Sequence, residues 1–587
     1  MAALPLRFSH GALVEDGQRT RFSLWAPDAR SVELELDGAT FAMAPEANGW
    51  FRLHRRCPLG ALYRYRIDGE LSVPDPASRY QPQGVHGPSQ VVAPQRYPWR
   101  HGHWRGRPWR EAVIQELHIG LLGGYAGVMA ELPRLAELGI TAIELMPLNQ
   151  FPGERNWGYD GVLPFAPQHS YGTPQQLQAL IDQAHGLGLM VLLDVVYNHF
   201  GPDGNYLHRY ASGFFREDRQ TPWGAAIDLR RSEVRDFFIE NALMWLSDYR
   251  FDGLRLDAVH ALDDPGFLRA LSGAVRQHCG EDRHCWLVLE NEANQASLLE
   301  HAFDGQWNDD GHNTLHVMLT GEQEGYYADF QQPTARLARC LEQGFVYQGQ
   351  ASHRGTPRGE PSAHLPPSAF VLFLQNHDQT GNRALGERLS MLCPPQALRA
   401  ATCLLLLAPM IPLLFMGDEW ACEQPFLFFT DHHDELAEAV RSGRRAEFKG
   451  FAAFADAAQR ERIPDPNALQ TFLASRPRRN AHSASWEAFH RELLQLRHQH
   501  IVPRLEGARA LGVDILGDLA VSARWRLGDG SELRIDLNLG PSAVHAQRPA
   551  SHQPLFNCTE AVQQPGMLHP YSALVSLSPT SLAEPAP

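Results

Sequence analysis

Arg255 and Asp257 are the residues from which the chemistry of this chain can first be argued, because they stand at the end of a short apolar stretch that begins at Gly253. Side chains two residues apart on a β-strand lie on the same face. A guanidinium beside a carboxylate keeps that carboxylate ionised and limits its freedom, which suits a nucleophile. An isolated Arg-x-Asp is more often an ordinary ion pair, so the neighbouring residues must decide.

Further polar residues stand at the ends of other apolar stretches. They are Asp194, Asn198 and His199 in one place, Glu290 in a second, and Asn376, His377 and Asp378 in a third. Carboxylates that converge at one rim cannot all be comfortably ionised. If Arg255 holds Asp257 as an anion, the pKa of an acid without a cation rises until that acid keeps its proton at neutral pH. We predict Glu290 in this role, because a protonated acid facing an ionised one is the arrangement that cleaves glycosidic bonds.

The identity of the protonated acid leaves one alternative open. Glu290 and Glu292 are two residues apart and share a face, so strand alternation does not choose between them. We choose Glu290 because it directly ends the apolar run Trp286–Leu289, with Glu292 as its neighbour.

The elements that must position these residues repeat as strand, loop and helix from Val113 onward. Amphipathic helical stretches are expected at 126–138, 174–187, 232–248 and 265–278, and a closing helix at 486–500. The expected strands are 113–117, 140–146, 189–196, 253–257, 286–290, 303–307, 369–375 and 411–416. This count predicts an α/β fold with a (β/α)₈ TIM barrel, whose chemistry lies at the carboxyl ends of the strands.

Two smaller β-domains are expected on either side of the barrel. Residues 1–100 predict an N-terminal β-sandwich, 101–502 the catalytic barrel, and 503–587 a small C-terminal β-domain. Trp25 in the sandwich could bind sugar or pack in the core, and we favour core packing. The apolar run from Ala400 to Gly417 contains Pro409 and Pro412, so we expect a buried helix, a turn and a buried strand rather than a membrane span.

Composition favours a neutral substrate. The 587 residues include 52 Lys and Arg against 67 Asp and Glu, a net charge of −15, which argues against nucleic acid or an acidic membrane as partner. No basic segment followed by an apolar core begins the chain, so we expect no signal peptide. The eight cysteines show no Cys-x-x-Cys spacing and are expected to be reduced thiols of a cytoplasmic protein. No calcium-loop pattern occurs, and hydrolysis without metal or cofactor is the expectation.

Four stretches together resemble the α-amylase superfamily of glycoside hydrolases. They are Asp194-Val-Val-Tyr-Asn-His199, Gly253-Leu-Arg-Leu-Asp257-Ala-Val-His260, Glu290 and Gln375-Asn-His-Asp378. The resemblance implies a retaining mechanism with Asp257 as nucleophile, Glu290 as general acid and then base, and Asp378 gripping the sugar hydroxyls. The two reacting carboxyls should then lie about 5–5.5 Å apart. It further implies that Asp194 braces Arg255, that His199 and His377 hydrogen-bond the sugar, and that Tyr159 stacks on its face.

Within that superfamily, a narrower resemblance is to the malto-oligosyltrehalose trehalohydrolases. It rests on Asn308-Asp-Asp-Gly-His312, Leu319 to Tyr327, Gln375 to Arg388 and Pro425 to His432. It implies hydrolysis of the α-1,4 bond next to a terminal trehalose unit, and a functional partnership with the synthase that makes this substrate. The predicted substrate-binding residues are Tyr159, His199, Arg255, His260, Asp309, Asp310, His312, His377, Asn382 and Arg383.

Two kinds of alternative remain. The first is a debranching, branching or α-amylase-like enzyme on the same scaffold; a branching enzyme usually carries Ser-His-Asp-Glu where this chain has Asn376-His-Asp-Gln379, so we rank it lower. A barrel that only binds sugar or acts as a scaffold is not excluded by the fold. The intact acids Asp257, Glu290 and Asp378 argue against it, because a scaffold needs none of them.

Overall fold

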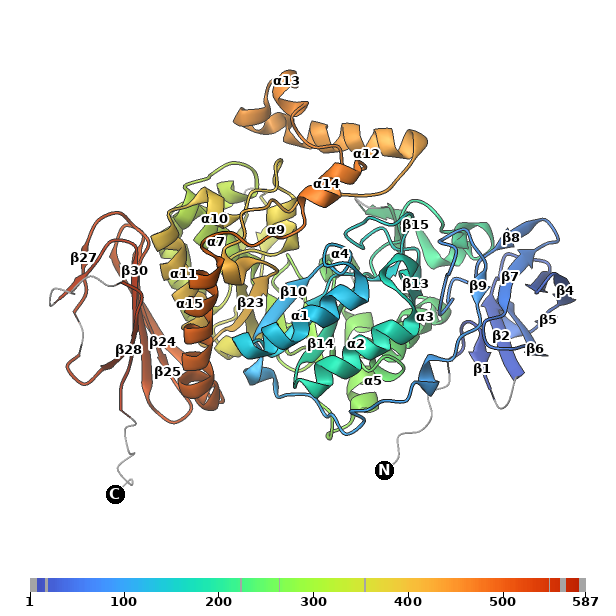
Figure 1. Ribbon diagram of the computed structural model, residues 1–587, viewed down its shortest axis with the longest axis horizontal. Helices are drawn as coiled ribbons and strands as arrows, with labels where there is room; N and C mark the ends of the chain where they lie inside the picture. Colours follow the sequence, from blue (N-terminus) through green and yellow to red (C-terminus); the bar gives the residue numbers. More distant parts are fainter. Residues whose placement is uncertain are drawn as a thin grey trace.

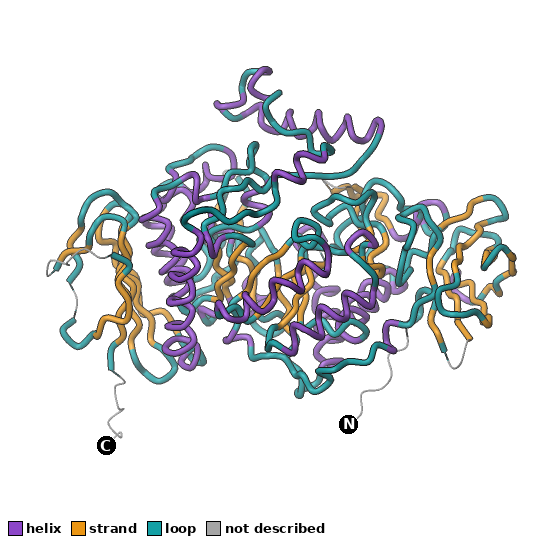
Figure 2. The backbone as a smooth tube through the Cα atoms, in the orientation of Figure 1, coloured by secondary structure: helices purple, strands orange, loops and turns teal. Residues whose placement is uncertain are grey.

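A closed barrel of eight parallel strands forms the centre of the molecule. The computed structural model describes residues 8–15, 19–221, 224–262, 264–352, 355–547, 549–559 and 566–579. In Figure 1 the N-terminal strands lie at one end of the barrel and the C-terminal strands at the other. Figure 2 shows the same division, with strands at both ends and helices around the central strands.

All eight predicted barrel strands are present and pair in chain order. They are β10 (Ile114–Leu117), β11 (Ala142–Leu145), β14 (Met190–Val195), β17 (Gly253–Leu256), β18 (Trp286–Leu289), β19 (Gly305–Trp307), β22 (Phe370–Phe373) and β23 (Ile411–Phe415). Every residue of these strands is buried, as expected for a sheet that is covered on the outside and filled on the inside. The barrel prediction is therefore confirmed, including the strands that carry the acids.

The predicted helices lie outside the barrel. They are α1 (Gly124–Leu138), α2 (Pro174–Gly186), α3 (Ser232–Ser247), α5 (Pro265–Cys279) and α15 (Ser483–Leu496). Local capping explains where two of them begin: Thr173 and Gln176 form a capping box before α2, and Asp264 accepts a hydrogen bond from the Phe267 amide at the start of α5. The apolar run near residue 400 is α11 (Pro395–Leu407) followed by β23, which confirms the buried helix and strand.

The N-terminal strands form two sheets. One has the order β1-β2-β6-β5, with β2 at Arg19–Trp25 and β6 at Trp50–Arg56; in the other, β3 (Val32–Leu36) pairs with β7 (Leu62–Ile67). Trp25 is 4% exposed, donates its indole N–H to the Asn48 carbonyl oxygen (2.8 Å) and packs edge-on against Phe214. It belongs to the core, as predicted, and is not available to sugar.

The C-terminal strands pack against the barrel's helices. The sheet has the order β24 (Arg509–Gly517), β25 (Ala520–Arg526), β26 (Glu532–Asn538), β30 (Ser572–Leu577) and β28 (Gln553–Asn557). Its Trp525 indole lies within hydrogen-bonding distance of the Leu341 carbonyl (3.3 Å) in α8 (Pro333–Gln343). The buried Arg497 near the end of α15 donates to the carbonyl oxygens of Leu406, Ala408 and Met410, and so fixes this helix to the link between α11 and β23.

The prediction that all cysteines are reduced is wrong for one pair. Cys279 at the end of α5 and Cys285 just before β18 form a disulfide, with Cα atoms 6.5 Å apart across a short turn. Spacing could not reveal it, because proximity here depends on how the chain reverses between helix and strand. Within the described ranges, no helix is long and apolar enough to cross a membrane.

A helical excursion follows β23 and was not predicted. It contains α12 (Asp434–Glu447), α13 (Ala457–Arg460) and α14 (Leu469–Ala474), and it projects above the rest of the molecule in Figure 1. Gly325 lies against the tip of the Phe451 ring, where a Cβ atom would come within 2.7 Å of the ring carbon Cζ. The excursion therefore touches the loop that follows α7 (Asp309–Thr320), beside the site described next.

Candidate active site

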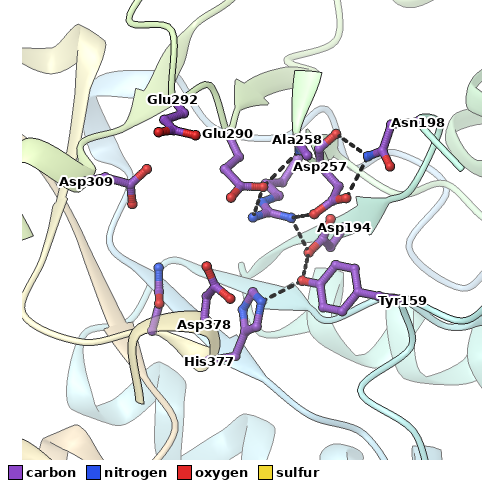
Figure 3. Close-up of polar contacts among 12 residues, drawn as sticks. Tyr159, Asp194, Asn198, Asp257, Ala258, Glu290, Glu292, Asp309, His377 and Asp378 are labelled. Atoms are coloured by element: carbon purple, nitrogen blue, oxygen red, sulfur yellow. Dashed lines mark hydrogen bonds and ion pairs between the residues drawn. The ribbon is translucent and has the colours of Figure 1, made fainter. Parts of the chain in front are cut away.

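The three predicted acids meet at the carboxyl end of the barrel (Figure 3). Asp257 follows β17, and its amide donates to the Val195 carbonyl at the end of β14; the Glu290 amide donates to Leu256 at the end of β17. Asp378 lies in the first turn of α9 (His377–Gly381), whose start is fixed because the Asn376 side chain accepts from the Gln379 amide (2.8 Å). Continued strand pairing and one helix cap thus place the acids.

Arg255 lies beneath the acids and binds three carboxylates. Its Nη1 donates to Asp194 (2.7 Å) and Asp257 (2.9 Å), and its Nη2 lies 2.8 Å from Glu290 Oε2. The guanidinium is 1% exposed and lies 4.2 Å from the centre of the Trp307 ring. The brace between Asp194 and Arg255 is present as expected. The expectation that Glu290 has no cation beside it is wrong, because strands β17 and β18 bring both side chains to one level.

The pKa values of Asp257 and Glu290 nevertheless move apart. Burial acts to raise the pKa of Asp257, but Arg255, His199 and a hydrogen bond from Asn198 (2.8 Å) outweigh it, so the pKa is lowered. For Glu290, burial raises the pKa well above its ordinary value, and repulsion from Asp257, Asp378 and Asp309 adds to this against the pull of Arg255. The two shifts have opposite directions, so Asp257 favours the anion and Glu290 favours the protonated acid.

The geometry separates Glu290 from Glu292. Glu290 Oε2 accepts from the Ala258 amide (2.9 Å), which a left-handed turn at Ala258 (φ 41°) points toward it. The Glu292 side chain is about half exposed and lies near His260, whose ring nitrogen accepts from the Glu292 amide (3.3 Å). Only Glu290 is buried against the other acids, which favours our choice between the two.

Tyr159, His377 and Asp194 form a hydrogen-bonded row beside the acids. The Tyr159 hydroxyl donates to Asp194 Oδ2 (2.6 Å) and lies 2.9 Å from His377 Nε2, with the two rings stacked. His199 lies behind this row, with Nε2 3.0 Å from the Tyr159 carbonyl oxygen. Figure 3 shows Tyr159 on one side of the acids and Asp309 on the other. A sugar held at the acids would therefore have a phenol ring at one side.

A cavity of about 650 Å³ opens beside Glu290 and Asp378. Four of the predicted substrate-binding residues line it, namely His260, Asp309, Asn382 and Arg383. The sequence reasoning missed its far wall, which consists of Tyr327, Phe330, Arg358, Phe448, Phe451 and Phe454. The aromatic residues of the helical excursion carried a signal, since three phenylalanines at spacing three suggest a shared surface. Nothing in the sequence linked that surface to the acids.

The charged residues in this cavity are constrained by neighbours. Burial, opposed by Arg358 and reinforced by Asp378, raises the pKa of Asp309 to about 7. Arg383 binds both oxygens of Glu322 (2.7 and 2.9 Å) and one of Glu387 (3.2 Å), so its charge is largely balanced. The Asn382 amide donates to Asp378 and orients that carboxylate. These groups present a mixed set of donors and acceptors, as a polyhydroxylated ligand requires.

Two predicted substrate contacts are not supported. Asp310 is fully buried and accepts hydrogen bonds from Asn294 and from the amides of Val346 and Tyr347, so it holds the structure around α7 together. His312 is 1% exposed and is bonded to the Leu374 carbonyl oxygen (2.8 Å). Neither lines the cavity, because α7 presents Asp309 and, one turn later, Asn313 to the opening, whereas Asp310 and His312 face the core.

The described residues contain no group of three or more His, Cys, Asp and Glu side chains arranged to hold a metal ion. The carboxylates at the site face Arg255 and one another, and they are used by hydrogen bonds to protein groups. Hydrolysis without metal or cofactor stays a prediction.

Comparison with known proteins agrees with this geometry. Residues 95–243 match the alpha amylase catalytic domain family, and residues 508–575 match a domain of unknown function (DUF3459). The closed barrel, the acids at its rim and this match define a glycoside hydrolase of the α-amylase superfamily. A malto-oligosyltrehalose trehalohydrolase from Deinococcus radiodurans is 42% identical over 497 residues, 82% of each chain, and one from Rhizobium sp. is 38% identical over 94% of this chain and 97% of that protein. The chain belongs to the malto-oligosyltrehalose trehalohydrolase family.

Solved structures extend the likeness over the whole chain. A protein from Salmonella typhimurium, provisionally described as an alpha amylase, has a TM-score of 0.92 and is 42% identical, covering 98% of this chain and 100% of that one. A pullulanase from Paenibacillus barengoltzii, with a TM-score of 0.72 at 20% identity, shares the fold.

Proposed function

We propose that this chain hydrolyses the α-1,4-glucosidic bond next to the terminal trehalose of malto-oligosyltrehalose and releases trehalose. The family carries the proposal, because relatives of that name are 37–42% identical over most of the chain. The geometry supports it, since a sugar-sized cavity of about 650 Å³ opens beside Glu290 and Asp378, and the pKa values of Glu290 and its neighbour Asp257 are shifted in opposite directions.

In the first step, Asp257 attacks the anomeric carbon of the glucose before the trehalose unit. The C–O bond to trehalose breaks, Glu290 gives its proton to the leaving oxygen, and a glucosyl ester of Asp257 forms. Arg255 stabilises the anion before attack because it contacts the attacking carboxylate directly. The raised pKa of Glu290 favours the protonated form that this step requires.

In the second step, the now ionised Glu290 takes a proton from water, and the water oxygen attacks the same carbon. The ester bond breaks, Asp257 returns as a carboxylate, and Glu290 is protonated again, so the anomeric configuration is retained. Asp378, held by Asn382, accepts hydrogen bonds from sugar hydroxyls that tighten in the oxocarbenium-like transition state. The two reacting carboxyls are expected about 5–5.5 Å apart.

The remaining contacts follow from position. Tyr159 lies at one side of the acids with His377 stacked on it and His199 behind; both ring nitrogens of His377 are bonded, to Glu116 and to Tyr159. His260, Asp309, Asn382 and Arg383 line the cavity on the other side, where we place the trehalose unit. The aromatic wall at Phe448, Phe451 and Phe454 offers apolar faces to sugar rings.

The cellular setting is part of the proposal. We infer a cytoplasmic enzyme that acts after a malto-oligosyltrehalose synthase, because its substrate must first be capped with trehalose. The Cys279–Cys285 disulfide removes the reduced cysteines as an argument for this location.

One incubation tests the substrate. A maltodextrin capped with trehalose and a plain reducing maltodextrin of equal length are each given to the protein, and the products are separated by chromatography. We expect trehalose from the first and little cleavage of the second. Glucose or maltose as the main product from both would replace the proposal with an α-amylase-like activity. Glu290→Gln serves as the control, because a trace contaminating glucosidase would be unaffected by it.

A further inference from the structure

Glu116 is a buried acid that the reaction above does not use. It lies on β10, is 1% exposed, and accepts hydrogen bonds from the backbone amide of His377 (2.9 Å) and from His377 Nδ1. Both carboxylate oxygens of Glu116 are thus used by His377, which belongs to the Gln375–Asp378 motif after β22. An acid inside a buried strand is costly unless it is paired, and here the pair is an imidazole at the active site.

A second acid lies directly beside it. Glu144 on β11 pairs in register with Glu116, so both side chains point into the barrel at the same level. Neither Glu144 oxygen has a hydrogen-bond partner among the residues that the structure describes. Burial, with repulsion from Glu116 as a further cause, raises the pKa of Glu144 well above its ordinary value. The two neighbours therefore differ: burial and repulsion favour the protonated form of Glu144, whereas both oxygens of Glu116 accept hydrogen bonds from His377.

From His377 the contacts continue to the nucleophile without a break. His377 Nε2 lies 2.9 Å from the Tyr159 oxygen, and the Tyr159 hydroxyl donates to Asp194 (2.6 Å). Arg255 Nη1 then joins Asp194 to Asp257, at 2.7 and 2.9 Å (Figure 3). Because Tyr159 gives its only proton to Asp194, its oxygen can face His377 only as an acceptor. This row of hydrogen bonds from His377 to Asp257 therefore requires a proton on His377 Nε2.

The charges around His377 decide whether both nitrogens are protonated. The titratable and charged groups around it are Glu116 from β10, His118 just after β10, Asp194 from β14, Arg255 from β17, Tyr159 from the loop after β12 (Asn149–Gln150), and Asp378 on its own helix. Burial and Arg255 favour the neutral ring, while Glu116 and Asp378 favour the cation. The balance raises the pKa of His377, with the charge and hydrogen bond of Glu116 as the main causes.

We propose that Glu116 is a positioning residue for hydrolysis, which keeps both nitrogens of His377 as hydrogen-bond donors and thereby fixes Tyr159, Asp194 and Arg255 behind Asp257. With a neutral His377, protonated on the Glu116 side, two acceptors would face each other between the imidazole and the Tyr159 oxygen. Tyr159 would then turn its proton away from Asp194, and the support behind the nucleophile would be lost. The inference rests on the proposed hydrolysis at this site, but not on its specificity for trehalose.

The pH dependence of His377 predicts the direction in which the activity profile should shift. His377 has a raised pKa, so the cation predominates below that pKa and is lost as pH rises through it; activity falls with it. In Glu116→Gln the burial and the Arg255 charge remain, so the pKa of His377 falls. We expect the basic limb of the kcat/KM profile to move to lower pH and kcat/KM at pH 7 to drop about 10- to 100-fold, the range of a charged hydrogen bond.

Glu144→Gln is the matched control, because it makes the same change one strand away on an acid whose raised pKa favours the neutral form. Its basic limb should coincide with that of the wild type. In a His377→Asn background, Glu116→Gln should cause no further shift. Ionisation of Glu290 cannot imitate the result. Loss of positive charge at His377 would raise the pKa of Glu290, and this would move the basic limb to higher pH rather than to lower pH.

The assay uses a chromogenic aryl maltoside as well as trehalose-capped maltodextrin. If the enzyme proves not to be specific for trehalose-capped substrates, the pH profile of kcat/KM can still be measured with the maltoside. Histidine labelled with ¹³C at Cε1 provides a readout that needs no turnover: one imidazole signal, absent in His377→Asn, should remain charged to higher pH in the wild type than in Glu116→Gln. Thermal melting checks folding, and Glu116→Asp, with a shortened anion, should give a smaller shift in the same direction. Three results would overturn the proposal. They are a basic limb at the same pH in the wild type and Glu116→Gln, a shift of that limb in Glu144→Gln as large as in Glu116→Gln, and an imidazole titration that Glu116→Gln leaves unchanged.

Discussion

Replacing Arg255 by lysine tests how the acids are organised. Arg255 reaches three carboxylates with two nitrogens, Asp194 and Asp257 through Nη1 and Glu290 through Nη2. A lysine keeps the positive charge but has one ammonium group on a stem without the planar fork, so it cannot reproduce all three contacts. The substitution therefore removes the geometry of the three contacts while it preserves the positive charge.

The size of the effect follows from the hydrogen bonds that a lysine cannot make. A hydrogen bond between charged groups contributes about 1.5–3 kcal/mol. If the ammonium group keeps one of the three carboxylates as its partner, two such bonds are missing. Their absence costs about 3–6 kcal/mol, which corresponds to a fall of about 10²- to 10⁴-fold in kcat/KM. Arg255 is also the largest of the influences that lower the pKa of Asp257 against its burial. We therefore expect the acidic limb of the pH profile to move upward, because the nucleophile must be ionised to attack.

Steady-state kinetics between pH 4 and 9 would measure both effects, with circular dichroism to confirm the fold. Arg497→Lys is the matched control, since Arg497 is equally buried and binds three groups, but these are backbone carbonyls below α15. We expect lower stability in that variant and unchanged kcat/KM of the folded protein. If Arg255→Lys retained kcat/KM within threefold of the wild type, with the acidic limb in place, the reasoning about the three-carboxylate contact would be refuted.

The remaining predictions concern the acids and one buried pair. Asp257→Asn and Glu290→Gln should each lower kcat by several orders of magnitude in a folded protein, which single-turnover rates would measure. The wild type should lose activity as pH rises through the raised pKa of Glu290, and a basic limb that begins near the ordinary glutamate pKa would contradict this. Asp252→Ala should destabilise the fold by about 3–5 kcal/mol in urea unfolding, because Asp252 accepts from the fully buried His185 (2.9 Å) and from the Val191 amide (3.0 Å).

The barrel and the meeting of its acids could be predicted because both follow from local patterns. Each strand is a short apolar run, and residues that end such runs converge at one rim once the sheet closes. Asp257, Glu290 and Asp378 were found in this way. The contact between Arg255 and Glu290 was not, since it depends on the stagger of β17 against β18, which no single strand encodes.

Burial of motif residues was harder to predict. Asp309, Asp310 and His312 stand together in the sequence, and all three were expected at the substrate. The helix α7 presents Asp309 to the cavity and turns the other two into the core, where Asp310 accepts hydrogen bonds from Asn294 and backbone amides and His312 is bonded to the Leu374 carbonyl oxygen. A motif therefore predicted where the site lies, but not which of its residues face the sugar.

Glu116 and Glu144 did leave a signal, since each is an acid in the middle of an apolar strand. A buried charge costs more than an apolar side chain of the same size, even when it is well paired. The barrel nevertheless contains Glu116, Asp194 and Arg255 beneath its rim, each bound to a group on another element. Stability alone does not account for them, because apolar residues would fill this layer at lower cost. Their contacts lead upward to Asp257 and His377, so the unfavourable burial is best explained by the orientation that it gives the acids.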